Sequence, residues 1–185
     1  MEHITDPVEK KLTAALMELM EKLPIDKIPT SQILKRAGVG RSTFYRRYRD
    51  KYDLLNSSYQ HILDFTLFRV TGGTSYKEAF FNLYGVLKEC PSFIKNALSS
   101  TDTNGLRNYI YRQSYAFFSE MMGTQGIDMT DAYNHLLLTG YITGTLEVTC
   151  IWVQNGMKES LETLFSLNYQ LMPETIRTCI TLYYM

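Results

Sequence analysis

Residues 30–51 read Thr-Ser-Gln-Ile-Leu-Lys-Arg-Ala-Gly-Val-Gly-Arg-Ser-Thr-Phe-Tyr-Arg-Arg-Tyr-Arg-Asp-Lys, and this segment decides the fold. It holds seven cations and one anion, so its net charge is +6, although the whole chain is neutral. A basic run taken alone usually marks a solvated face. Here the cations accompany a pattern of two short helices joined by a glycine turn. That pattern is typical of a helix-turn-helix that reads DNA.

The first helix of the pair is predicted from a cap, an apolar stripe and a glycine stop. The Thr30 hydroxyl can accept a hydrogen bond from a free backbone NH of the opening turn. Gly38 stands where a helix end commonly needs a positive φ, and Val39 then places an apolar side chain between the two helices. The apolar residues at helical spacing are Ile33, Leu34 and Ala37.

The second helix is expected to begin near Gly40 or Arg41 and to present two different faces. Phe44 and Tyr48 are four residues apart and are predicted to face the core. The opposite face carries groups that contact DNA, namely Arg41, Ser42, Tyr45 and Arg46. Ordinary packing is the alternative role of Tyr45.

The position of a residue along the helix pair indicates whether it contacts DNA bases or the DNA backbone. Residues near the start of the second helix usually read bases, and Arg can recognise guanine with two hydrogen bonds. We therefore expect Arg41, Ser42 and Thr43 to read bases, while Gly40 lets the backbone approach the duplex closely. Asp50 is expected to cap the following helix.

Phosphate contacts are expected from the remaining donors of the segment, because such contacts fix register without reading sequence. We assign them to Tyr45, Arg46, Arg47 and Lys51. Thr30 completes the predicted set of DNA-binding residues.

The run from Ile33 to Tyr48, followed by Asp-Lys-Tyr-Asp-Leu-Leu at 50–55, resembles the N-terminal domain of the TetR family. The resemblance implies an all-helical, homodimeric transcriptional regulator with a separate ligand-sensing domain. Arg47 stands where the family most often has His, and Tyr48 stands where it usually has Phe. Arg47 keeps a phosphate donor and Tyr48 keeps an aromatic wedge, so these departures bear on operator preference more than on DNA binding.

Chain length and composition agree with an all-α protein of two parts. The 185 residues can hold a three-helix DNA-binding domain at 1–52 and a helical regulatory and dimerisation domain at 53–185. No stretch reads as a sheet, and no apolar run is expected to be long enough to span a bilayer. The first residues lack the features of a signal peptide, so we expect a cytoplasmic protein without a membrane partner.

The sequence gives little support to catalytic, metal or redox chemistry. The three histidines are scattered, and there is no metal-helix motif, nucleophile elbow or phosphate loop. No catalytic residue, cofactor or metal is therefore expected. Cys90, Cys150 and Cys179 are odd in number and far apart, which indicates reduced packing residues, with a redox sensor as the alternative.

Helical periodicity and chain breaks predict the other helices. The first is expected to start at Thr5 or Asp6, with Pro7 in its first turn and Leu23 at the end of its apolar stripe. The clearest break is the Thr-Gly-Gly-Thr run at 71–74, after which Ser75 and Glu78 form a capping box. Helices are expected at 51–69, 75–90, 91–98, 105–122 and 130–155, and from 160 onward with an interruption at Pro173. The helix at 51–69 is expected to carry any ligand signal to the DNA-reading unit.

Residues 61–185 differ from the N-terminal part in charge and in aromatic content. They carry eight cations against eleven anions, whereas residues 1–60 carry eleven against eight, so only the N-terminal part favours nucleic acid. Most of the C-terminal aromatic side chains are expected in the core. Because buried tyrosines need partners for their hydroxyls, a subset is expected to line a ligand pocket: Tyr84, Tyr111, Tyr115, Phe118 and Tyr141.

The stretch from Gly140 to Met157, ending in Trp-Val-Gln-Asn-Gly-Met, resembles a TetR subgroup that includes regulators of dihydroxyacetone kinase operons. The resemblance implies that this helix and the next pair with their copies in a second chain. The alternative is that the glycines accommodate a neighbour within the same chain. The expected interface residues are Gly140, Gly144, Val148, Ile151 and Trp152.

Together the helix-turn-helix pattern and the family resemblance imply a homodimeric transcriptional regulator that binds a palindromic operator. A small molecule or a partner protein is expected to control it through the C-terminal domain. The alternatives are a regulator that has no small-molecule ligand and acts through a protein partner, and, with least support, an all-helical enzyme. The sequence leaves repression versus activation open.

Overall fold

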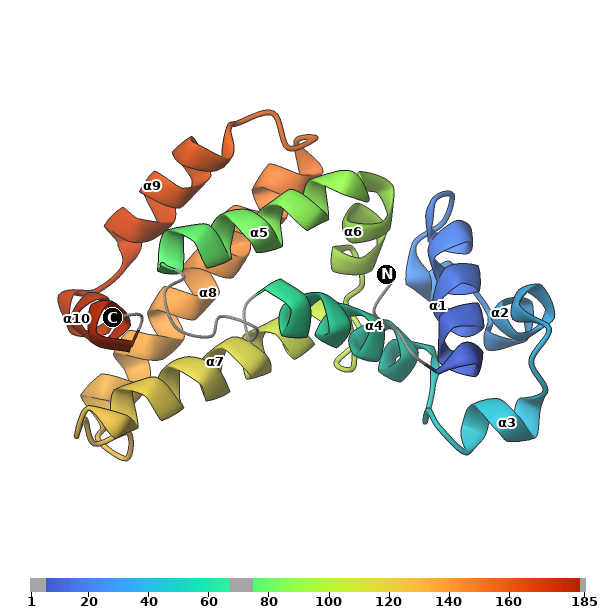
Figure 1. Cartoon of the computed structure of the whole chain (residues 1–185), viewed down its shortest axis with the longest axis horizontal. Coiled ribbons are helices and arrows are strands. Elements are labelled where there is room, and N and C mark those ends of the chain that lie inside the picture. The colour runs from blue at the N-terminus through green and yellow to red at the C-terminus, as the bar shows by residue number, and fades with distance from the viewer. Residues whose placement is uncertain (1–5, 67–74, 184–185) are drawn as a thin grey trace. The chain divides into compact units, whose positions relative to one another are not determined.

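The computed structural model describes residues 6–66 and 75–183, and every regular element in these ranges is a helix (Figure 1). The all-α fold expected from the sequence is confirmed. The elements form two compact units, Met1–Phe65 with Glu89–Tyr109, and Thr66–Lys88 with Ile110–Met185.

The first unit contains the predicted helix-turn-helix. Its elements are α1 (Pro7–Met20), the short 3₁₀ helix η1 (Ile25–Lys27), α2 (Thr30–Ala37), α3 (Arg41–Tyr45), α4 (Lys51–Thr66) and α6 (Pro91–Leu98). Their apolar faces meet in one core, which excludes water from the reading unit. Side chains with no exposed surface include Leu12, Leu16, Met20, Ile25, Ile28, Ile33, Phe44, Leu54 and Leu55.

Two helix starts in this unit differ in how they are capped. Asp6 caps α1 at the helix start expected from the sequence, because its carboxylate accepts hydrogen bonds from the backbone NH groups of Val8 and Glu9. The predicted cap at Thr30 is wrong. The capping position of α2 is Pro29, which has no side-chain hydrogen bond, and Thr30 is already the first helical residue.

The α6 segment belongs to the first unit although it follows α5 in the chain. The Asn96 side chain donates to the carbonyl oxygen of Met20 at 2.6 Å, and Ser100 Oγ donates to Asp26 Oδ1 at 2.6 Å. Asn56 on α4 donates to the carbonyl oxygen of Asn104 at 2.9 Å. By packing, α4 and α6 therefore lie with the helix-turn-helix, whereas a functional boundary after residue 52 stays a prediction.

The second unit is built from α5 (Tyr76–Glu89), α7 (Leu106–Thr124), α8 (Ala132–Gln154), α9 (Leu161–Leu171) and α10 (Glu174–Tyr183), with the first residues of α7 in the other unit. Phe80 on α5 meets Phe165 on α9, with ring centroids 5.3 Å apart. A second apolar cluster joins α7, α8 and α10, and it contains Phe118, Met121, Met122, Leu138, Tyr141, Ile142, Ile176 and Cys179.

Several predicted helix boundaries are confirmed by their caps. Ser75 and Glu78 form the expected capping box, in which Ser75 N donates to Glu78 Oε2 at 2.8 Å and Glu78 N donates to Ser75 Oγ at 3.2 Å. Gly156 has φ +81° just beyond α8, and Pro173 separates α9 from α10. The break at 71–74 and the end of the helix expected at 51–69 fall within 67–74, outside the described residues.

The α8 helix corrects one expectation from the sequence. It has 23 residues, its most apolar stretch has a mean hydropathy of 1.4, and 44% of that stretch is buried. By length and composition this is a candidate membrane span, so the expectation that the chain has none is wrong. A buried helix in the core of a water-soluble protein meets the same criteria. In this unit Tyr141 of α8 belongs to the apolar cluster with α7 and α10, and Trp152 of α8 packs against Tyr84 of α5.

The cysteines lie in packed positions. Cys150 and Cys179 are buried, and Cys90 is partly buried. Burial raises the pKa of the Cys90 thiol to about 11 and also raises the pKa of Cys179. Because a sensing thiol needs a lowered pKa, these shifts favour the packing role.

Candidate DNA-reading interface

The turn between α2 and α3 has the predicted geometry. Gly38 adopts φ +65° and ψ +34°, the left-handed conformation that glycine tolerates without steric cost. The Val39 amide then donates to the carbonyl oxygen of Leu34 at 3.1 Å, which closes the end of α2. Gly40 has extended backbone and precedes α3 directly.

The buried side of α3 is anchored by two aromatic rings. Phe44 has no exposed surface, and Tyr48 is buried. Their ring centroids are 5.6 Å apart. The helix itself ends at Tyr45, earlier than the sequence predicted, but the Tyr48 amide still donates to the carbonyl oxygen of Phe44 at 2.9 Å. Tyr48 therefore supports α3 from the turn that follows it.

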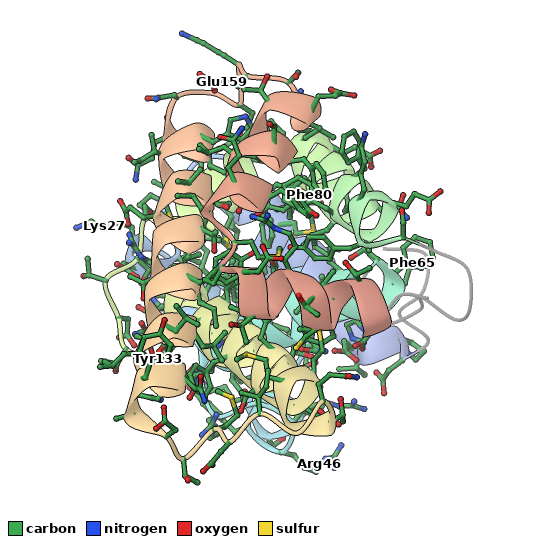
Figure 2. The ribbon with its side chains drawn as sticks, turned by 90° about the vertical axis from the view of Figure 1, so that its left-hand side faces the viewer. Lys27, Arg46, Phe65, Phe80, Tyr133 and Glu159 are labelled. Carbon is green, nitrogen blue, oxygen red and sulfur yellow. The ribbon has the colours of Figure 1, made fainter. Side chains whose placement is uncertain are left out.

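The outer side of α3 carries exposed cations. Arg41, Ser42, Tyr45 and Arg46 are exposed, and Thr43 is partly buried. Neither Arg41 nor Arg46 has a salt bridge or hydrogen bond to any residue in the described ranges. Figure 2 shows the Arg46 side chain extending away from the ribbon. The Tyr45 side chain is 57% exposed, and its ring meets the Phe44 ring edge-on with the centroids 5.2 Å apart, so packing against Phe44 leaves its outer side open to a DNA contact.

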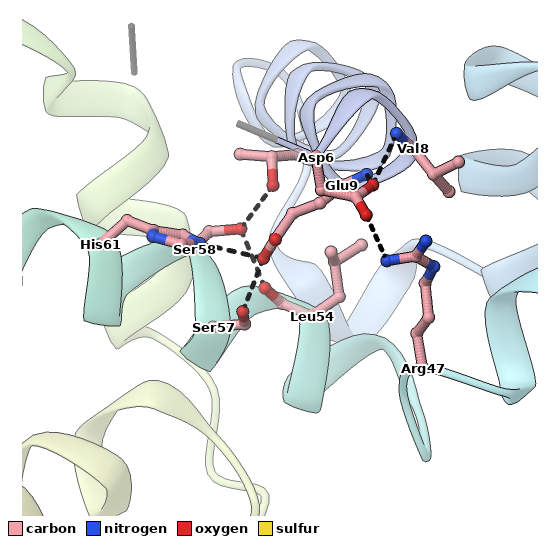
Figure 3. Close-up of polar contacts among 9 residues, drawn as sticks. Asp6, Val8, Glu9, Arg47, Leu54, Ser57, Ser58 and His61 are labelled. Carbon is pink, nitrogen blue, oxygen red and sulfur yellow. Dashed lines mark hydrogen bonds and ion pairs between the residues drawn. The ribbon is translucent and has the colours of Figure 1, made fainter. Parts of the chain in front are cut away.

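Arg47 differs from its neighbour Arg46 because it is already paired. Its Nη1 donates to Asp6 Oδ2 at 2.8 Å, and this contact joins the turn after α3 to the start of α1 (Figure 3). The sequence predicted a phosphate contact and gave no sign of this partner. The two residues are 41 positions apart.

The Lys51 side chain also has hydrogen-bond partners within the chain. Its ammonium donates to the carbonyl oxygens of Asp26 at 3.2 Å and Ile28 at 2.9 Å, and it lies 5.2 Å from the centre of the Tyr52 ring. Burial lowers its pKa, although nearby carboxylates act in the opposite direction. Lys51 therefore holds α4 to η1, a role that the sequence analysis missed.

The carboxylate of Asp50 caps α4 as predicted. Its Oδ1 accepts from the backbone NH groups of Tyr52 at 2.8 Å and Asp53 at 2.9 Å. This cap fixes the start of α4 beside the turn that carries Arg47.

Glu9 joins α1 to α4 through a polar cluster that the sequence analysis did not single out (Figure 3). Its Oε1 accepts from Ser57 Oγ at 2.8 Å and lies 3.0 Å from His61 Nε2. Burial acts to raise the pKa of Glu9, but the hydrogen bonds from His61 and Ser57 lower it overall. The i, i+4 spacing of Ser57 and His61 was the available signal, because it places both on one face of α4.

The five predicted pocket residues have partners within their own unit. Tyr84 forms a 2.8 Å hydrogen bond with Thr149 and stacks on Phe80 at 4.1 Å. Three further ones lie along α7: Tyr111 donates to Thr139 at 3.3 Å, Tyr115 lies 2.6 Å from His135 Nδ1, and Phe118 belongs to the core cluster. Tyr141 is buried and also lines a shallow apolar hollow with Leu136, Leu137, Gly140, Gly144, Leu171 and Pro173.

One side of α8 and α9 exposes large apolar side chains, which we call the α8–α9 apolar face. It comprises Tyr133, Leu136, Gly140, Gly144, Val148 and Ile151 on α8, with Leu167 and Leu171 on α9. Tyr133 is 70% exposed and Leu136 is 66% exposed. A Cβ atom added to Gly140 or Gly144 would meet nothing within 4 Å. Nothing in the described part of the same chain therefore requires these two glycines.

Trp152 does not lie on this face and is removed from the expected interface. Its side chain is 3% exposed, its Nε1 donates to the carbonyl oxygen of Glu159 at 3.1 Å, and its ring lies 5.9 Å from that of Tyr84. Ile151, the preceding residue, is 49% exposed and stays in the set.

A helix pair with a left-handed glycine turn, a buried aromatic anchor and a cationic outer side defines a helix-turn-helix DNA-binding protein. Residues 12–57 match the model described as "Bacterial regulatory proteins, tetR family", and residues 74–174 match "Transcriptional regulator C-terminal region". The second match covers more than half of the chain. The chain therefore belongs to the TetR family of transcriptional regulators and is not an enzyme.

Comparison with solved structures agrees with this family. The structure titled "Dihydroxyacetone kinase operon activator DhaS" is similar over 92% of this chain and 97% of its own, with a TM-score of 0.62 and 18% sequence identity. At this identity the likeness shows a shared fold. No curated protein sequence matches the chain significantly.

Proposed function

We propose that the chain acts as a homodimer and binds a palindromic operator, with one α3 helix in each of two successive major grooves. The observation that carries this proposal is the outer side of α3, where Arg41 and Arg46 are exposed and unpaired among the described residues. A duplex offers such cations the phosphates and guanine edges that they lack within the chain.

Within this interface, Arg41, Ser42 and Thr43 are assigned to bases and Tyr45 and Arg46 to phosphates. Gly40 supports close approach, because a Cβ atom there would meet nothing within 4 Å and the space stays open to the duplex. Thr30 at the start of α2 is assigned to the duplex backbone. Arg47 and Lys51 are weaker contacts than the sequence suggested, since both already hold partners in the chain.

We assign the α8–α9 apolar face to the dimer contact. Exposed side chains such as Leu136 and Ile151 gain free energy when a second apolar surface covers them. The open glycines at 140 and 144 let a neighbouring helix approach closely. Two copies related by a two-fold axis would present two reading helices about 34 Å apart, the spacing of successive major grooves.

Control through the second unit is part of the proposal, and a partner protein is favoured over a small molecule. The hydroxyls of Tyr84, Tyr111 and Tyr115 all have partners in their own unit, so a ligand would have to displace existing hydrogen bonds. The similarity to a protein titled an operon activator agrees with a regulator of gene expression of this kind. A regulator of transcription acts where DNA is, which supports a cytoplasmic location.

Segments other than α4 also connect the two units and can transmit a signal between them. The chain passes between the two units at 65–66, at 88–89 and at 109–110. We therefore propose that α4, the end of α5 and the start of α7 all transmit a change in the second unit. This replaces the expectation that α4 is the single route.

The test is binding of the full-length protein to its own upstream DNA, measured by electrophoretic mobility shift. Wild type is compared with Arg41→Ala and with Lys27→Ala, an exposed lysine on η1. We expect Arg41→Ala to weaken binding to the preferred site and Lys27→Ala to leave it nearly unchanged. Equal binding by all three proteins would contradict the assignment of α3 as the reading helix.

A further inference from the structure

The pair between Asp6 and Arg47 is held by more than mutual attraction. Asp6 Oδ1 accepts from the amides of Val8 at 2.8 Å and Glu9 at 3.0 Å, while Oδ2 accepts from Arg47 Nη1 at 2.8 Å (Figure 3). Both carboxylate oxygens are therefore engaged. Because the first oxygen is fixed to the start of α1, the second holds Arg47 at a fixed place beside the end of α3.

The Asp6 carboxylate is negatively charged at neutral pH. Hydrogen bonds from the Glu9 amide and from Arg47 hold the pKa of Asp6 below its usual value. Asp6 thus places a permanent negative charge where a DNA phosphate would otherwise reach two free amides and one guanidinium.

A comparison of Arg47 with the adjacent Arg46 shows how the contact with Asp6 affects the availability of a cation for DNA. Arg46 is the adjacent residue and the same residue type, yet it has no partner among the described residues, whereas Arg47 is paired to a fixed anion. We propose that Asp6 is an internal competitor of DNA phosphate for Arg47 and thereby limits the affinity of the reading unit for DNA. This inference rests on the proposed function, since it requires that DNA docks on α3.

The experiment replaces Asp6 by residues that keep the cap and remove the charge. Asn and Ser cap helices about as well as Asp, so Asp6→Asn and Asp6→Ser preserve the start of α1. Asp50→Asn is the matched control: it also caps a helix in the same unit and also removes one negative charge, and Asp50 has no salt bridge among the described residues. Unfolding midpoints check that all variants fold.

Binding to the upstream DNA is measured by fluorescence anisotropy from 50 to 300 mM salt. We expect Asp6→Asn and Asp6→Ser to bind about three-fold more tightly than wild type, as expected for releasing one exposed ion pair. The plot of log affinity against log salt should steepen by about 0.9, the value for one additional phosphate contact. Asp50→Asn should change the slope by less than half as much.

Arg47→Ala separates this inference from a general effect of charge. In wild type it should weaken binding little, whereas in the Asp6→Asn background it should abolish the whole gain. The inference is overturned if Asp6→Asn weakens binding or leaves it unchanged, or if its gain persists without Arg47. If Arg41→Ala also has no effect, the proposed interface itself fails; if Arg41→Ala weakens binding, only the role of Asp6 is lost.

Discussion

The outer side of α3 and the α8–α9 apolar face are both exposed, but they expose opposite chemistry. The first presents Arg41 and Arg46 without anionic partners among the described residues, and the second presents Tyr133 and Leu136 to water. Water solvates cationic side chains favourably, whereas the exposure of large apolar side chains to water is unfavourable. The comparison supports the proposal that the α8–α9 apolar face contacts a protein and that the outer side of α3 contacts DNA.

The largest expected effect comes from placing a charge in the α8–α9 face. Leu136→Arg should shift the protein from dimer to monomer, because an unpaired cation would be buried when the face is covered. We expect the dimer dissociation constant, measured by analytical ultracentrifugation, to rise by more than about 100-fold. The fold of one chain should be unaffected, since Leu136 is 66% exposed.

The matched control for this change is Gln125→Arg, which adds the same charge in the exposed loop after α7 of the same unit. It should remain dimeric. A Leu136→Arg protein that sediments as the wild type does would break the assignment of this face.

The next effect concerns the outer side of α3. Arg41→Ala should cost about 1 to 3 kcal/mol of binding free energy at the preferred site and relax the base preference at one position of each half-site. Competition between the operator and single-base variants measures both quantities. Loss of affinity that is equal for every sequence would make Arg41 a phosphate contact and move base reading to Ser42 and Thr43.

Lys51→Ala tests whether a cation that is hydrogen-bonded within the chain contributes to stability. The Lys51 ammonium binds two backbone carbonyls, so its removal should lower the free energy of unfolding by about 1 to 2 kcal/mol. Urea unfolding measures this change, with Arg46→Ala as the control because Arg46 has no such partner among the described residues. Equal stability of Lys51→Ala and wild type would restore Lys51 as a pure DNA contact.

The smallest effect is a pH dependence carried by Glu9. Its pKa is lowered in the folded protein, so its stabilising contribution is fully present above its unfolded pKa of about 4.5. That contribution is lost as the pH falls through the lower folded-state value. The stability difference between wild type and Glu9→Gln should therefore shrink in acid when urea unfolding is compared at pH 7 and pH 3.

The control for Glu9 is Glu120→Gln, which removes an exposed carboxylate on α7 that has no hydrogen bond or salt bridge to any residue in the described ranges. Its difference from wild type should stay small at both pH values. A difference for Glu9→Gln that is the same at pH 7 and pH 3 would show that the hydrogen bonds of Glu9 do not depend on its charge.

Local features of the sequence predicted the helices and the turn well. Pro91 fits only the first turn of a helix, and α6 indeed spans Pro91–Leu98. Gly38 takes the left-handed conformation that was expected of it. Such features depend on neighbours within a few residues, and the sequence shows those directly.

Long-range contacts could not be predicted in the same way. Arg46 and Arg47 are the same residue type in adjacent positions, and only the fold brings Asp6 to one of them. On α8 the apolar residues occur on nearly all sides, so periodicity did not separate exposed Ile151 from buried Trp152. The polar cluster around Glu9 joins helices about 50 residues apart in the chain.

The most direct test of the central claim is a hydroxyl-radical footprint of the protein on its own upstream DNA. The account predicts two protected patches on one side of the duplex, separated by about one helical turn and related by a two-fold axis, with two chains bound per duplex. In Arg41→Ala both patches should fade together. A single patch, or one chain per duplex, would contradict a homodimer that reads DNA through α3.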